Sequence, residues 1–127
     1  MAEKSASRQN FPLAFKNSGN YLYWLKLITM YLIREVFQAK PGKAKDLVKM
    51  FKQAVPHFEK MGQASNMKIL TDIVSTYWTV VVESETEDMG SFFSNMRSAT
   101  MSDELKDIMK GYMDCVEGGR REIFIIE

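Results

Sequence analysis

Two stretches, Trp78-Thr-Val-Val-Val82 and Ile123-Phe-Ile-Ile126, decide the fold of this 127-residue chain. Both are rich in β-branched and aromatic residues, which favour β-strands. Neither stretch alternates apolar and polar residues, as a strand with one solvated face does. We therefore predict strands that are covered on both faces.

The rest of the chain supplies two further strands and two helical regions. The predicted strands span residues 30–39, 67–74, 77–83 and 120–127, and the helical regions span 44–61 and 84–116. This order, β-α-β-β-α-β with right-handed crossovers, predicts an α+β fold of the ferredoxin-like type. Its four-stranded antiparallel sheet carries both helical regions on one side.

The first helix is the clearest element. Its apolar residues recur at spacings of three and four, which is one apolar stripe of a helix: Ala44, Leu47, Phe51, Ala54, Phe58 and Met61. Pro56 lacks an amide hydrogen and predicts a kink or a break near Val55. Gly62 is placed to end the last turn.

The boundaries of the later elements rest on turn and capping residues. Ser75-Thr76 is the predicted turn between the second and third strands, and residues 84–87 match a helix capping box. The helix after that box is predicted to break at residues 98–100 and to restart at Ser102. Its last apolar stripe is predicted to close at Gly118-Gly119.

One layer of helices covers only one face of a four-stranded sheet. Because the strands are apolar on both faces, the other face needs a partner, and a second copy of the chain supplies one. The sequence thus predicts a homodimer built sheet on sheet, with an interface of roughly 2,000 Å² or more in total.

The charge distribution separates the N-terminus from the rest of the chain. Residues 1–29 carry a net charge of +3 and residues 30–127 a net charge of −2. We expect 1–29 to be an N-terminal arm or a non-native leader, a secretory signal being a third reading, and 30–127 to be the barrel domain. The folded part has no basic surplus, so nucleic acid is not an expected partner. The apolar run at 21–33 contains Lys26 and is too short to span a membrane, so no membrane association is expected either.

The chain has one cysteine, Cys115, and one histidine, His57. A single cysteine excludes an internal disulfide and fits a reducing compartment, so the cytoplasm is the expected location. No metal site built on several thiolates or imidazoles of one chain is possible. The sequence also lacks dinucleotide-binding, phosphate-binding-loop and serine-hydrolase motifs, and we expect no cofactor.

The chain resembles the dimeric α+β barrel superfamily, and within it the NIPSNAP-like and antibiotic biosynthesis monooxygenase-like branch. The residues that carry the resemblance are Ile33-Arg-Glu35, Lys40-Pro-Gly-Lys43, Val55-Pro-His-Phe-Glu-Lys-Met-Gly62 and the apolar third and fourth strands. The resemblance implies a ligand pocket between helices and sheet. Members of the superfamily include cofactor-free monooxygenases, isomerases, haem-degrading enzymes and proteins without known activity. No spacing here matches a particular catalytic set, so no catalytic residue is assigned, and haem has no supporting motif.

Four residues are candidates for ligand binding, and each has a structural alternative. His57 is either a general base or haem ligand at the rim of the pocket, or a hydrogen-bonded histidine at the edge of a buried face. Arg34 either binds a ligand carboxylate or pairs with an acid on a neighbouring strand or across the dimer. Trp78 and Tyr112 either line the pocket or belong to the core or the dimer packing.

These features predict a homodimer that binds a small apolar or aromatic molecule in a helix–sheet cleft. Whether it is also an enzyme is left open. The alternative is a cofactor-independent monooxygenase or isomerase, or a haem-handling enzyme of the same fold. Two or more polar groups converging in an apolar pocket would favour catalysis, whereas a fully packed cleft would favour a structural role.

Overall fold

A computed structural model describes residues 29–62, 64–97 and 101–127. The elements along the chain are β1 (Tyr31–Ala39), α4 (Ala44–Lys60), β2 (Ser65–Thr71), β3 (Thr79–Thr86), α5 (Met89–Arg97), α6 (Asp103–Ile108), α7 (Tyr112–Cys115) and β4 (Val116–Ile125). The predicted arm at 1–29, apart from its last residue, and the predicted helix break at 98–100 lie outside the described residues.

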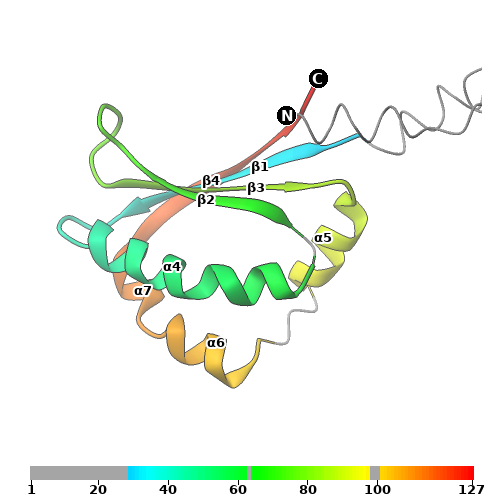
Figure 1. The fold of residues 1–127 in the computed structure, drawn as a ribbon. Coiled ribbons are helices and arrows are strands. Elements are labelled where there is room, and N and C mark those ends of the chain that lie inside the picture. The colour runs from blue at the N-terminus through cyan, green and yellow to red at the C-terminus, as the bar shows by residue number, and fades with distance from the viewer. Residues whose placement is uncertain (1–28, 63, 98–100) are drawn as a thin grey trace, which may run out of the picture.

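The four strands form one antiparallel sheet in the order β2-β3-β1-β4. This is the predicted ferredoxin-like α+β arrangement, with β1 and β3 in the centre. Figure 1 shows the described helices on one side of the sheet and none of them over its opposite face. We call the two sides the helix face and the open face.

The core lies between α4 and the helix face. Side chains alternate along a strand, so one set of β1 positions meets the helices and the other set meets the open face. The buried core cluster joins Ala39, Val80 and Val82 of the sheet to Leu47 and Phe51 of α4. The predicted apolar stripe of the first helix is thus the surface that packs on the sheet.

Helix α4 runs through Pro56 to Lys60, so of the predicted kink or break near Val55 the break does not occur. The proline costs one backbone hydrogen bond, but tertiary packing supplies most of the stability of a helix in a protein. Ala54 is fully buried just before the proline, and Phe58 is half-buried just after it. Gly62 ends the last turn as predicted, with a φ of 73° and its amide donating to the Glu59 carbonyl at 3.0 Å.

The hairpin between β2 and β3 is wider than predicted. β2 ends at Thr71 and β3 begins at Thr79, so residues 72–78 form a loop where the sequence predicted a turn at Ser75-Thr76. Side-chain hydrogen bonds replace the strand pairing here. The Thr79 amide donates to Asp72 Oδ1 at 3.2 Å, and the Thr79 hydroxyl donates to the Thr76 carbonyl at 2.6 Å.

The predicted capping box at 84–87 is also wrong, because Ser84 is a buried residue of β3. Asp88 caps α5 instead. Its Oδ1 accepts from the Ser91 amide at 2.9 Å, and its Oδ2 accepts from the Ser91 hydroxyl at 2.6 Å. These hydrogen bonds stabilise the carboxylate and lower the pKa of Asp88 below its usual value. The start at Ser102 is confirmed, since its hydroxyl caps α6 by accepting from the Leu105 amide at 3.2 Å.

The last strand begins four residues earlier than predicted. β4 starts at Val116, and Gly118-Gly119 lies inside the strand instead of closing a helix. The register against β1 skips Glu117, which is a bulge in β4. A Cβ at Gly119 would lie 2.2 Å from the Val36 carbonyl oxygen, so this glycine is required by the close approach of the two strands.

Candidate functional site: a helix–sheet cavity

A cavity of about 310 Å³ lies between α4, the helix face of the sheet and helices α5 to α7. Its lining is mainly aromatic and methionine side chains. The apolar lining residues are Phe37, Phe51, Val55, Phe58, Met61, Ala64, Met67, Val82, Phe92, Met96 and Met109. A mainly apolar pocket at this place agrees with the pocket expected from the sequence.

Four polar side chains also line the cavity: Glu35, Asn95, Tyr112 and Arg121. Glu35 in β1 and Arg121 in β4 are directly paired in the sheet register, and both point to the helix face. Their side chains form an ion pair between Arg121 Nε and Glu35 Oε1. The sheet therefore holds a carboxylate and a guanidinium side by side at the cavity.

Aromatic rings contact both Arg121 and the third polar residue of the cavity, Tyr112. The Arg121 guanidinium carbon lies 5.7 Å from the centre of the Phe92 ring, within the range of a cation–π contact. The Tyr112 ring meets the Phe37 ring edge-on, with centroids 6.1 Å apart. Burial, and secondly the negative charge of Glu35, raise the pKa of Tyr112 above its usual value. Tyr112 is therefore an uncharged hydroxyl at neutral pH.

Of the four residues singled out in the sequence, only Tyr112 lines this cavity. His57 lies between two residues that do, Val55 and Phe58, but is not a lining residue itself. Its Nε2 lies 3.7 Å from Glu104 Oε1, so it faces α6. His57 thus contacts the helix layer and is not among the lining residues, and its predicted place at or near the rim stays a prediction.

Trp78 lies in the turn before β3, with a φ of 65° and 43% of its surface exposed. It lines a separate shallow hollow beside Lys45 and the start of α4. The structure therefore does not bring Trp78 together with Tyr112 at one site.

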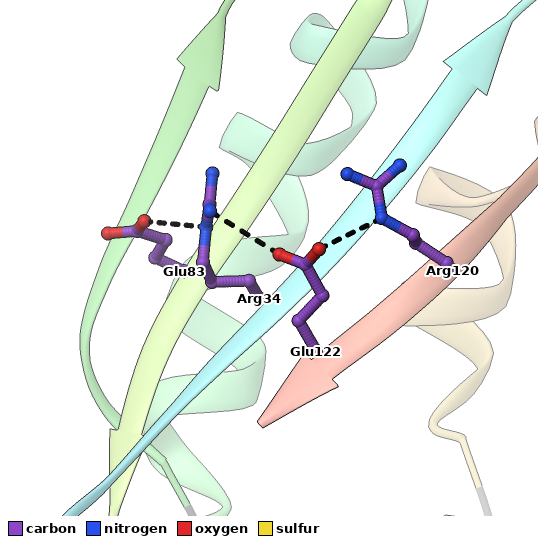
Figure 2. Close-up of polar contacts among 4 residues, drawn as sticks. All are labelled: Arg34, Glu83, Arg120 and Glu122. Atoms are coloured by element: carbon purple, nitrogen blue, oxygen red, sulfur yellow. Dashed lines mark hydrogen bonds and ion pairs between the residues drawn. The ribbon is translucent and has the colours of Figure 1, made fainter. Parts of the chain in front are cut away.

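Arg34 projects from the open face, on the side of the sheet away from the cavity. Its Nε lies 3.1 Å from Glu83 of β3, and its Nη1 lies 3.3 Å from Glu122 of β4. Arg120 pairs with the same Glu122 at 2.9 Å. Figure 2 shows these four side chains as one row across the strands. The prediction that Arg34 pairs with acids on neighbouring strands is confirmed.

The Glu35–Arg121 pair was not identified from the sequence. The available signal was the position of Glu35 between apolar residues that alternate to the helix face, Ile33 and Phe37. Its partner could not be found, because pairing Arg121 with Glu35 needs the register of two strands 86 residues apart.

None of the helices in the described part of the chain has the length and apolar character that a bilayer crossing requires. Within residues 29–62, 64–97 and 101–127, no three His, Cys, Asp or Glu side chains are grouped so as to hold a metal ion. The cavity lining also contains no histidine.

Comparison of the sequence with protein-family models gives no match, and comparison with curated proteins gives none either. Solved structures do match. A NIPSNAP family protein from Agrobacterium tumefaciens superposes with a TM-score of 0.64 at 8% identity, over 77% of this chain and 86% of that chain. A NIPSNAP domain protein from Burkholderia xenovorans gives a TM-score of 0.61 at 11% identity, over 77% and 94%.

A third structure, from Chloroflexus aurantiacus, is provisionally assigned as an antibiotic biosynthesis monooxygenase. It gives a TM-score of 0.58 at 10% identity, over 77% of this chain and 93% of that chain. These descriptions are those of the branch that the sequence resembles. At such identities the likeness establishes the shared fold, and activity has to be argued from the site itself.

Proposed function

We propose that this chain forms a homodimeric α+β barrel that binds a small apolar or aromatic molecule in its helix–sheet cavity. The observation that carries the proposal is an apolar cavity of about 310 Å³ with a few polar groups at one side. Ligand sites in proteins commonly have this composition, with apolar walls for affinity and a few polar groups for orientation.

The walls indicate the kind of ligand. Rings of Phe37, Phe51 and Tyr112 lie with centroids 4.8 to 6.3 Å apart and give flat apolar surfaces. Methionine side chains are flexible and polarisable, so they adapt to ligands of different outline. A planar aromatic molecule fits these walls better than a phosphate or a sugar, whose polar groups would lose hydrogen bonds to water.

The open face supports the homodimer. Phe124 is 47% exposed and Leu70 is 38% exposed on this face, although both belong to strands. The charges between them, Arg34, Glu83 and Glu122, are already paired within one subunit. A second copy could therefore cover these three charges without leaving any of them buried and unpaired, which is the costly case.

A second candidate function is cofactor-independent catalysis, either oxygenation or isomerisation of the bound molecule. The observation that favours it is the convergence of Glu35, Arg121 and Tyr112 in an apolar cavity, because such sites combine binding with proton transfer or charge stabilisation. A neighbour in fold carries a provisional monooxygenase assignment. We propose no haem chemistry, because His57 does not line the cavity and no other histidine exists in the chain.

The binding proposal is tested by closing the cavity. Ala64 lines it and is half-buried, so Ala64→Phe should place a ring in the space that a ligand would occupy. With 2-naphthol as the probe, we expect calorimetry to give a Kd on the order of 100 µM for the wild type. The Ala64→Phe variant should bind about tenfold more weakly or worse.

The matched control is Lys60→Phe, which adds the same ring to an exposed position of α4 outside the cavity lining. It should bind 2-naphthol as the wild type does. Equal weakening by both variants, or full binding by Ala64→Phe, would place the ligand elsewhere and contradict the proposal.

A further inference from the structure

We propose that the Glu35–Arg121 ion pair, together with the Tyr112 hydroxyl, selects an uncharged aromatic ligand that carries a hydroxyl or carbonyl group, and rejects the corresponding carboxylate. This inference rests on the proposed binding function and names the ligand class of the same cavity. It follows from the charges that line the cavity, from the rigidity of the ion pair, and from the donors and acceptors that the pair presents.

The charges of the described residues that line the cavity sum to zero. Among these residues, Glu35 and Arg121 are the only ionisable groups besides Tyr112, and they neutralise each other. A carboxylate entering this space would leave two negative charges against one guanidinium. An uncompensated charge in an apolar site is costly, so the anion is disfavoured even though an arginine is present.

The ion pair cannot easily turn away to serve an incoming anion. Its two residues are directly paired on adjacent strands, where the sheet fixes their backbone. Only 35% of the Arg121 side chain and 25% of the Glu35 side chain are exposed. The Phe92 ring lies against the guanidinium at 5.7 Å and limits its orientation further. An anion would thus have to compete with Glu35 for a guanidinium that is already engaged.

The same groups suit a neutral polar substituent. A guanidinium has five N–H donors and a carboxylate has two acceptor oxygens, so one ion pair leaves capacity on both partners. A ligand hydroxyl can donate to the Glu35 carboxylate and accept from Arg121. A ligand carbonyl can accept from Arg121 or from the Tyr112 hydroxyl, which stays protonated because burial raises its pKa.

The test compares 2-naphthol with 2-naphthoate, which share the same ring system and are neutral and anionic, respectively, at pH 7. Calorimetry of the wild type should give at least about tenfold tighter binding of 2-naphthol. Glu35→Gln keeps the side-chain shape but removes the negative charge. This variant should improve 2-naphthoate binding by about tenfold and should leave 2-naphthol within about threefold of the wild type.

Two further variants keep the result interpretable. Glu35→Gln combined with Arg121→Gln has neither charge and should lose the gain in 2-naphthoate affinity that Glu35→Gln alone produces, because that gain depends on the Arg121 charge. Glu59→Gln removes an exposed carboxylate of α4 outside the cavity lining and should change neither affinity. Thermal unfolding of each variant checks that it is folded at the titration temperature.

The outcomes separate this inference from the proposed function. If the wild type binds both compounds equally well, or if Glu35→Gln leaves the preference unchanged, the charge argument is overturned while the binding proposal stands. If the wild type binds neither compound, the proposed function fails, and this inference fails with it.

Discussion

Gly119→Ala should destabilise the protein more than an alanine at any other glycine in the described part of the chain. The new Cβ would lie 2.2 Å from the Val36 carbonyl oxygen and 3.3 Å from the Phe37 Cα, which are backbone atoms of β1. Backbone cannot rotate away as a flexible side chain can, so β4 would have to separate from β1. We expect a loss of about 3 kcal/mol in the free energy of unfolding and a fall in Tm of about 10 °C.

The neighbouring glycine provides the matched control. A Cβ at Gly118 would meet no atom within 4 Å, so Gly118→Ala should stay within about 0.5 kcal/mol of the wild type. Thermal and denaturant unfolding at one fixed protein concentration would measure both variants, because dimer dissociation makes Tm concentration-dependent. Equal stability of the two variants would show that β1 and β4 do not approach as described.

Phe124→Asp should dissociate the proposed dimer. Phe124 lies opposite Leu32 in the sheet register and is 47% exposed on the open face. An aspartate there would remove an exposed aromatic side chain from the open face and place an unpaired charge between the two sheets. We expect the dimer Kd to rise by about 100-fold or more. Light scattering should then change from twice the chain mass of 14.7 kDa to that mass itself.

Phe93→Asp is the control for this experiment. Phe93 is 36% exposed, but it belongs to α5 in the helix layer, away from the open face. The same substitution there should leave the dimer intact. A monomeric wild type, or a Phe124→Asp protein that stays dimeric at low micromolar concentration, would contradict sheet-on-sheet assembly.

The fold could be predicted because its main signals are local. The apolar stripe ending at Met61 and the β-branched run at 79–82 each determine an element without reference to distant residues. The predictions of element boundaries were wrong where tertiary contacts determine the local structure. Ser84 matches a capping pattern but lies within the central strand β3. Gly118-Gly119 resembles a helix end but lies in β4, where Gly119 allows the backbones of β4 and β1 to approach closely.

The cavity lies where the family resemblance implied a pocket, between helices and sheet, but only one of the four candidate residues, Tyr112, lines it. His57 is not a lining residue, because on α4 Val55 and Phe58 take the positions that line the cavity. The Glu35–Arg121 pair escaped notice because its two residues meet only through long-range strand pairing, which periodicity along the chain does not encode.

The most direct test of the central claim, ligand binding in the helix–sheet cavity, is a methyl NMR titration of protein labelled with 13C at the methionine methyl groups. The methionines that line the cavity are Met61, Met67, Met96 and Met109. Met113 is 75% exposed and is not a lining residue, so it serves as the internal reference. On addition of 2-naphthol, the four cavity methyl signals should shift together along one binding curve, while the Met113 signal stays in place. Shifts confined to Met113, or no shift at any cavity methionine at millimolar 2-naphthol, would contradict the claim.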